Sequence, residues 1–418
     1  MFGKKSVLGL AVVASTASIM GILPGTAYAD YAPTSNDVVG VGSDTLQALG
    51  NFVADGDFLG DPGYNAGKRN KFISIDATAD ANTRLAYSTG GVGSVALSCA
   101  PGTGATVGTG NQNVTHTDSP CSLNPTVLLR QGLSPVPRPN GSGAGFSLLK
   151  ADTNAAGVSS TGLVDFSRAS SARGSNVLFD SITVGTDPLG MLTSSTTDAT
   201  NALSIAQIKS IYNCTATNWS SFGTGSGTIV PLIPQVGSGT RGYFLQQIGL
   251  TDATIGSCVK AIEENDPEAI DASGSPANAV EPMSQSRLYL FQGKLSDGTS
   301  NGLGGYFKDS SCPALSTATA CATPTSTLNP NVKLWTSTDP VPTDAGTTFY
   351  PTRPVYFYFR HADQTSTKAF QPGSTLNWVK TMLNNPGGAP PYFCTGAGQA
   401  LISASGIIPA CTFNLAGP

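Results

Sequence analysis

The residues best suited to chemistry form one glycine-rich loop with a basic residue after it: Gly237, Ser238, Gly239, Thr240 and Arg241. An apolar run at 229–233 precedes the loop and apolar residues at helical spacing follow it, so it lies where a strand passes into a helix. A helix start offers unpaired N–H groups and a positive dipole end. With two hydroxyls and a planar guanidinium beside it, the loop predicts an oxyanion site. The alternative stays open that Ser238 or Thr240 only caps the helix.

Three more loops of small polar residues follow extended segments or open helices, at 43–45, 141–145 and 167–171. Four such loops in an α/β pattern predict a cleft lined by backbone amides and hydroxyls. The competing interpretation is that Ser43 or Asp44 caps the helix that follows. The ligand-binding residues expected from these three loops are Ser43, Asp44, Thr45, Ser142, Ser170 and Ser171.

The hydrophobic pattern predicts the elements that hold these loops. Strands are expected at 37–42, 72–75, 163–166, 182–192, 229–233 and 348–360. Helices are expected at 46–53, from 146, at 203–211, from 240, at 375–383 and within 396–409. Residues 266–287 are expected to be helical or irregular.

The first residues have the pattern of a secretory signal peptide. Lys4 and Lys5 precede an apolar stretch at 7–23, and Ala27-Tyr28-Ala29 has the form of a signal-peptidase site. We therefore expect cleavage after Ala29. No cysteine lies near that position and no later apolar run approaches about 20 residues, so a secreted protein without a lipid or membrane anchor is expected.

The eight cysteines form an even set, as expected for disulfides in an oxidising compartment. Neighbour pairing is the simplest arrangement, although sequence alone does not fix it: Cys99–Cys121, Cys214–Cys258, Cys312–Cys321 and Cys394–Cys411. No pair has Cys-x-x-Cys spacing and the only histidines are His116 and His361, so we expect no metal and no cofactor. Charged residues are 11% of the chain and the net charge is −4, which does not favour nucleic-acid binding.

The four loops, in this order, resemble those of the phosphate-binding proteins of bacterial phosphate ABC transporters over most of the chain. The similar stretches are GSGTR at 237–241, GSGAG at 141–145, VDF with RASS at 164–171, LSIAQIKSIYNCTATNW at 203–219 and YPTRPVYFYF at 350–359. The resemblance implies an α/β fold of the two-lobed, Venus-flytrap (type II) periplasmic-binding-protein kind, with a mixed sheet in each lobe. It implies residues 30–185 and 350–418 in lobe 1, residues 186–349 in lobe 2, and ligand capture by lobe closure.

Two departures from the family pattern bear on function. Ser171 stands where the family loop has an aspartate that accepts a hydrogen bond from protonated phosphate, so phosphate and sulfate should be discriminated less sharply unless Asp44 or Asp165 takes over. The chain also has extra segments at 90–124 and 297–345 and lacks the anchor cysteine common in such receptors.

An enzyme is the main rival, and the sequence gives it little support. Residues 298–302 fit Gly-x-Ser-x-Gly, but no strand leads into them and no helix follows. The other alternative is a secreted adhesive or scavenging protein that uses the same fold without a transporter. We expect a monomeric, non-enzymatic solute-binding protein for phosphate or a related oxyanion, which an ABC transporter permease would receive.

Overall fold

The computed structural model describes most of the chain after residue 32. The described residues are 33–57, 59–77, 112–113, 126–134, 136–174, 176–199, 201–223, 225–267, 269–301, 332–339 and 348–414. The expected signal peptide, His116, and the expected Cys99–Cys121 and Cys312–Cys321 pairs lie outside them, as does most of the two extra segments.

The backbone of the fold is a mixed sheet with the strand order β2-β1-β6-β12-β7-β10-β8-β9-β3, with β11 and β13 also paired to β7. Its strands are β1 (Val38–Gly42), β2 (Phe72–Ser74), β3 (Gln112–Asn113), β6 (Phe166–Ala169), β7 (Phe179–Ser194), β8 (Val230–Pro234), β9 (Lys260–Ile262), β10 (Ala279–Ser284), β11 (Val332–Trp335), β12 (Thr352–Arg360) and β13 (Ile408–Asn414). A separate pair joins β4 (Thr126–Val127) to β5 (Val136–Pro137).

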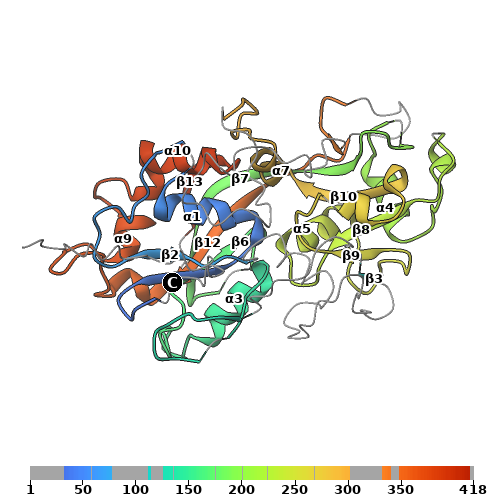
Figure 1. The fold of residues 1–418 in the computed structure, drawn as a ribbon. Coiled ribbons are helices and arrows are strands. Elements are labelled where there is room, and N and C mark those ends of the chain that lie inside the picture. Colours follow the sequence, from blue (N-terminus) through green and yellow to red (C-terminus); the bar gives the residue numbers. More distant parts are fainter. Residues whose placement is uncertain are drawn as a thin grey trace, which may run out of the picture.

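Two bodies flank β7 (Figure 1). The β1 group contains β2, β1, β6 and β12 with α1 (Gln47–Asp55), α3 (Ser142–Ala151), α9 (Trp378–Met382) and α10 (Gly396–Ala404). The β8 group contains β10, β8, β9 and β3 with α4 (Ile205–Tyr212), α5 (Gly239–Ile248), α6 (Ala269–Ala272) and α7 (Gln285–Phe291). This arrangement is a mixed α/β fold, as the sequence predicts. The predicted lobe boundaries stay a prediction.

Each group buries both faces of its part of the sheet. In the β1 group, α1, α9 and α10 cover one core and α3 covers the other. In the β8 group, α4 and α5 cover one core, and α6 and α7 cover the other. Strands that are buried on both faces read as continuous apolar runs, which is why 38–41 and 229–233 were recognisable.

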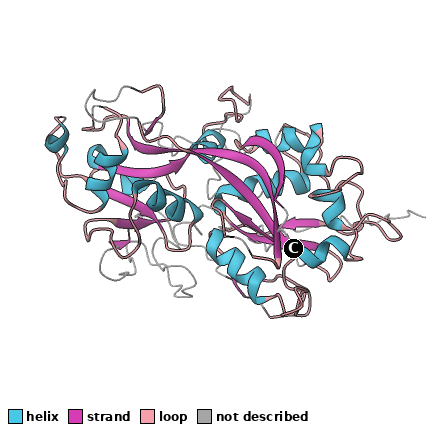
Figure 2. Cartoon of the chain, turned by 180° about the vertical axis from the view of Figure 1, so that it is seen from behind, coloured by secondary structure: helices cyan, strands magenta, loops and turns pink. Residues whose placement is uncertain are grey.

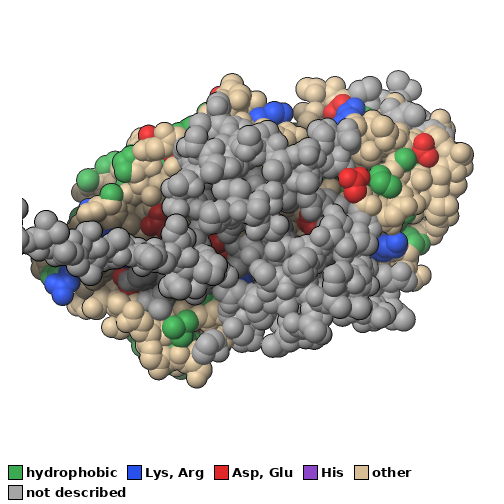
Figure 3. Space-filling model, viewed as in Figure 1, with side chains coloured by type: hydrophobic (Ala, Val, Ile, Leu, Met, Phe, Trp, Pro, Cys, Tyr) green, Lys and Arg blue, Asp and Glu red, His purple; other side chains and the backbone are tan. Residues whose placement is uncertain are grey.

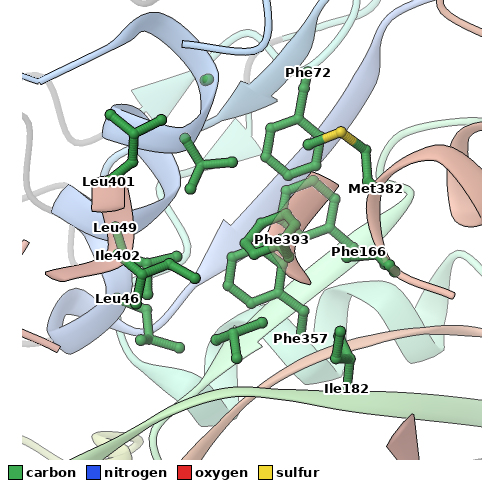
Figure 4. Packing of buried hydrophobic residues seen from close by; sticks show 14 of the residues in the cluster. Leu46, Leu49, Phe72, Phe166, Ile182, Phe357, Met382, Phe393, Leu401 and Ile402 are labelled. Atoms are coloured by element: carbon green, nitrogen blue, oxygen red, sulfur yellow. The ribbon is translucent and has the colours of Figure 1, made fainter. Parts of the chain in front are cut away.

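Aromatic rings fill the larger core of the β1 group (Figure 4). Phe166 stacks between Phe72 and Phe357, with ring centroids 4.7 Å and 5.1 Å apart. Phe393, from the short 3₁₀ helix η5 (Tyr392–Cys394), packs edge-on against both outer rings. Gly40 faces this stack, because a Cβ there would lie 1.9 Å from the Phe166 ring. Burial of these rings holds the strands of the β1 group against the helices that cover them.

Local capping explains where several helices begin. Ser204 and Gln207 form a reciprocal capping box at α4, and Thr395 caps α10 through the N–H of Gly398. Asn377 caps α9 in the same way. These side chains satisfy N–H groups that have no partner within the helix.

β7 is a single 16-residue strand that serves both groups. Its first part pairs with β12 and β13, and its second part pairs with β10 and β11 (Figure 2). Both β12 and β13 shift their pairing register opposite the same point of β7, the irregular step from Thr183 to Gly185. A side chain at Gly185 would meet Ile407 at 2.3 Å, so the strands approach closely there.

The structure corrects part of the element prediction. Residues 266–287, expected to be helical or irregular, contain α6, the short 3₁₀ helix η3 (Pro276–Asn278), the buried strand β10 and the start of α7. The sequence of β10, AVEPMS, hides its strand character because Glu281 and Pro282 interrupt the apolar run. The strand expected at 163–166 begins only at Phe166, and β9, β11 and β13 were not predicted.

Two of the four expected disulfides lie within the described residues, and both are present. Cys214 is bonded to Cys258, which ties the end of α4 to the segment before β9. Cys394 is bonded to Cys411, which ties η5 to β13. Neighbour pairing is therefore confirmed for these two pairs.

The described surface is sparsely charged. On the face shown in Figure 3, the Lys, Arg, Asp and Glu side chains of the described residues are scattered rather than gathered in a patch of one sign. Among the described helices, none has the length and apolar character that crossing a membrane requires.

Glu281 in β10 is buried, and neither of its carboxylate oxygens has a hydrogen-bond partner among the described residues. Burial, reinforced by nearby Asp266, raises the pKa of Glu281 well above its usual range. The folded state therefore holds a proton that the unfolded chain releases above about pH 4.3, so folding stability falls as pH rises from there toward the folded pKa.

We predict that Glu281→Gln removes this contribution, because glutamine has the same shape and never ionises. Between about pH 5 and pH 8, the unfolding free energy of the wild type should fall relative to that of the variant. Urea unfolding at both pH values measures the difference, with exposed Asp271→Asn as the control. Parallel pH profiles for the wild type and Glu281→Gln would contradict the prediction.

Candidate functional site

The predicted loops meet where the β1 group contacts the β8 group, a contact region that we call the seam. The Gly143 N–H donates to the Gly237 carbonyl at 2.9 Å. A Cβ on Gly239 would lie 2.2 Å from the Ser142 Oγ and 2.4 Å from the Ser170 Oγ, so only glycine fits at this contact. Loops from distant parts of the chain are therefore packed against each other, and their small residues make this possible.

Two helices begin at this seam from opposite sides. α3 starts at Ser142 in the β1 group, and α5 starts at Gly239 in the β8 group. The Ser142 Oγ lies 3.2 Å from the Ser170 Oγ and accepts the Ser170 N–H at 2.9 Å. The positive ends of two helix dipoles and buried hydroxyls thus share one small region, which favours negative charge.

Ser238 caps α5, since its Oγ accepts the Arg241 N–H at 3.1 Å. The side chain of Ser238 therefore caps the helix, as the alternative interpretation predicts. By contrast, Ser43 precedes the 3₁₀ helix η1 (Asp44–Leu46) without a side-chain capping bond. Its Oγ is buried and has no partner among the described residues.

Threonine hydroxyls from the two groups converge on one acid. The Thr45 Oγ1 lies 3.5 Å from the Thr240 Oγ1. Both hydroxyls donate to the Glu264 Oε1, at 3.1 Å and 2.6 Å, and the Thr240 N–H donates to it at 3.3 Å. Three donors from the predicted binding loops therefore meet a carboxylate that belongs to the protein.

Asp44 and Asn265 add a second contact across the seam. The Asn265 amide donates to the Asp44 Oδ2 and to the Thr45 Oγ1, both at 3.1 Å. The Arg287 Nη2 lies 3.6 Å from the Asp44 Oδ1, and both side chains are buried. Asp44 thus binds the β8 group in this structure.

A buried ion pair lies next to this cluster. Arg353, near the start of β12, donates twice to the Asp187 Oδ2, at 2.7 Å and 3.1 Å, and both side chains are fully buried. Ser284 donates to the other carboxylate oxygen at 2.8 Å. The Arg353 Nη2 also lies 3.5 Å from the Thr45 Oγ1, and its Nη1 has no partner among the described residues.

Arg241 and Ser171 are held by neighbours of their own. The Arg241 guanidinium donates to the Asp252 Oδ1 at 2.7 Å and to the Pro234 carbonyl at 2.9 Å. Ser171 is half-buried, and its Oγ accepts from the Arg173 guanidinium. Burial lowers the pKa of Arg173, while the charge of Glu264 acts in the opposite direction. Arg173 is therefore a cation within electrostatic reach of Thr45, Thr240 and Glu264, which we call the threonine cluster.

The remaining buried groups support the loops from behind. Asn140 and Gln235 precede the two glycine loops, and both donate their amides to Glu263, at 2.9 Å and 3.3 Å. Their amide oxygens are buried without a partner among the described residues. Arg168 donates to the carbonyls of Gly42 and Ile75, and burial lowers its pKa to about 10.

Asp165 does not lie at the seam. It precedes β6 at the opposite end of that strand, where its carboxylate accepts from Arg130 at 2.7 Å and from Lys368 at 2.8 Å. It also accepts the Val39 N–H at 2.8 Å. Its role is to join strands and loops, so it is not the acid that replaces the family aspartate.

The sequence prediction missed several residues of the seam: Asn140, Glu263, Glu264, Asn265, Arg287 and Arg353. Glu263, Glu264 and Asn265 come directly after β9, a strand parallel to β8. Polar residues at the carboxyl ends of neighbouring parallel strands lie at the same edge of a sheet. The polar residues after β9 could therefore have indicated the site, but the sequence analysis does not predict β9. In the described part of the chain, no group of three metal-ligating side chains is close enough to hold an ion.

Comparison with known proteins agrees with this fold. A family model described as a PBP superfamily domain matches residues 128–371. No curated protein matches the chain.

The solved structures that the chain matches include three proteins whose names mention phosphate. An ABC-type phosphate transport receptor from Vibrio cholerae is 16% identical, with a TM-score of 0.39, over 65% of this chain and 86% of that chain. A putative phosphate ABC transporter substrate-binding protein with bound phosphate from Clostridium perfringens is 17% identical, with a TM-score of 0.36, over 65% and 85%. The periplasmic phosphate-binding protein PfluDING is 11% identical, with a TM-score of 0.40, over 89% and 90%. Sequence identities and TM-scores this low do not show which ligand this chain binds.

We predict that Arg353→Leu destabilises the protein by about 3–5 kcal/mol, because it leaves the Asp187 carboxylate buried without its cation. Urea unfolding measures the change in unfolding free energy. Adding Asp187→Asn to this variant removes the uncompensated charge and should recover part of the loss. Strictly additive costs of the two substitutions would contradict this account of the pair.

Proposed function

Because the chain belongs to the PBP superfamily, we propose that it is a solute-binding protein that captures phosphate or a related oxyanion at the seam between the two groups. The proposed ligand-binding residues are those of the four loops: Ser43, Asp44, Thr45, Ser142, Ser170, Ser171, Ser238, Gly239, Thr240 and Arg241.

The observation that carries the proposal is the meeting of α3 and α5 at their positive ends, with hydroxyls from both groups between them. The Thr45 and Thr240 oxygens are only 3.5 Å apart although the residues are 195 positions apart in sequence. These donors are buried, and buried donors of this kind suit an acceptor with several oxygens and a negative charge. An oxyanion meets that description.

We propose capture by closure of lobe 1 (30–185 and 350–418) on lobe 2 (186–349), without covalent chemistry. Two helix starts and small polar loops at the seam suit a bound oxyanion, which supports a binding role. We further propose that the mature protein is exported, monomeric, and delivers its ligand to an ABC transporter permease. Extracellular scavenging without a transporter is the second candidate.

Isothermal titration calorimetry of the ligand-free protein with phosphate tests the function directly. Native mass spectrometry of the protein as purified should reveal a retained ligand of phosphate mass. If phosphate, sulfate and related oxyanions give no binding signal, the proposal is wrong.

We predict that Arg241→Ala weakens phosphate binding by about 2–4 kcal/mol, because a desolvated anion then lacks one cation. This requires the Arg241 guanidinium to turn from Asp252 to the ligand, which is feasible because the Asp252 side chain is 60% exposed. Calorimetry measures the affinity. Arg241→Lys should restore only part of it, since a point charge does not reproduce the planar fork.

Two matched variants show whether the loss belongs to Arg241. Asp252→Asn removes the carboxylate that competes with the ligand for the guanidinium and should leave phosphate affinity equal or higher. Arg173→Ala removes a different cation that lies within electrostatic reach of the threonine cluster. An unchanged affinity in Arg241→Ala, together with a loss in Arg173→Ala, would assign the charge to Arg173.

We predict that Asp44 contributes to selectivity for a protonated oxyanion, because an ionised carboxylate only accepts hydrogen bonds and repels a fully deprotonated ligand. Asp44→Asn should reduce the preference for phosphate over sulfate in competition binding across about pH 5 to 8.

Asp165→Asn is the matched control for this prediction, since Asp165 is bound at the other end of β6 by Arg130 and Lys368. It should leave the phosphate-to-sulfate ratio unchanged. Strong rejection of sulfate that survives Asp44→Asn would exclude Asp44 as the selecting acid.

A further inference from the structure

Glu264 has the contacts of a bound oxyanion. Its Oε1 accepts the hydroxyls of Thr45 and Thr240 and the Thr240 N–H, with donor–acceptor distances of 3.1, 2.6 and 3.3 Å. Those donors are the ones proposed for the captured ligand. A carboxylate that accepts a helix-start N–H and two hydroxyls makes the charge-assisted bonds that a ligand oxygen would make there.

The acid also joins the two groups. Glu264 follows β9 in the β8 group, while Thr45 belongs to the loop after β1. The residues on either side of Glu264 make their own contacts across the seam: Glu263 accepts from Asn140, and Asn265 donates to Asp44. The 263–265 segment therefore fills the seam from the β8 side, and Glu264 is its member that faces the threonines.

We infer that Glu264 is an internal ligand, a carboxylate that occupies the oxyanion position in the ligand-free protein and is displaced when an oxyanion is captured. This inference rests on the proposed function, and it makes Glu264 a specificity-determining residue. An incoming anion has to compete with a tethered carboxylate for the same donors.

Glu264 does not satisfy everything that the seam offers. The Ser43 Oγ and the Arg353 Nη1 are buried and have no partner among the described residues. Ser43 is two residues from Thr45, and the Arg353 Nη2 lies 3.5 Å from the Thr45 Oγ1, so both belong to the same cluster. A tetrahedral anion has more acceptor oxygens than a carboxylate and can meet the groups that Glu264 leaves unmet.

The competition selects by ligand chemistry. A small carboxylate such as acetate offers the same acceptor oxygens as Glu264, but it lacks the high effective concentration that a tethered side chain has. It should therefore fail to displace Glu264, whereas phosphate or sulfate gains the additional bonds. The exchange also removes one negative charge from the threonine cluster as another arrives, which avoids placing two anions on the same donors.

The first test is phosphate affinity by calorimetry in Glu264→Gln, which keeps the size of the side chain and removes its charge. We expect affinity about tenfold higher than in the wild type, the effect of losing a charge-assisted competitor. Glu263→Gln removes the same charge from the adjacent residue, which the amides of Asn140 and Gln235 hold instead of the threonines. It should raise affinity by much less. Equal rises in the two variants, or a fall in Glu264→Gln, would overturn the inference.

The second test needs no phosphate binding and so separates this inference from the proposed function. Glu264→Ala leaves the threonine donors without an acceptor, and acetate can take the vacated place. We expect acetate, compared with chloride at equal ionic strength, to raise the melting temperature of Glu264→Ala and not that of the wild type. No acetate effect in Glu264→Ala would overturn the inference, even if phosphate binds. Acetate rescue would support it even if phosphate does not bind.

Discussion

Buried hydrogen-bond donors at the seam need an acceptor, and much of the arrangement around the seam follows from that constraint. α3 and α5 both begin there, so N–H groups and hydroxyls gather where water is largely excluded. An unmet buried donor costs roughly 1–3 kcal/mol, so packing a group of them together is unfavourable unless an acceptor is supplied. Glu264 and Asp44 supply acceptors here. Acidic side chains therefore lie among loops that are suited to anions.

The sheet explains why such distant residues meet. β1, β6, β8 and β9 each end at the seam, and the loops at their carboxyl ends carry the hydroxyls and the acids. The other end of β6 carries Asp165, which binds Arg130 and Lys368. The same strand thus has one of the proposed binding loops at one end and a structural ion-pair cluster at the other. Position along the strand, rather than residue type, decides which of its polar residues face the seam.

Sequence patterns predicted the elements with clear apolar periodicity and the glycine loops, because both depend on local chemistry. They did not predict β10, whose Glu281 and Pro282 contradict strand preference locally and are accepted because tertiary packing surrounds them. The same limit applies to the site. Gly237 to Thr240 is a recognisable local motif, but the pairing of Thr240 with Glu264 depends on two strands lying side by side. Arg241 illustrates a further limit: it lies in the first turn of α5, and its partner Asp252 lies beyond the other end of that helix.

The irregular step in β7 affects the course of the whole strand. β12 and β13 both shift register opposite Thr183 to Gly185, so the ladders on the two sides of β7 are interrupted at the same place. A bulge bends its strand and increases the local twist. The direction in which β7 continues toward β10 and β11 therefore depends on the backbone of these three residues.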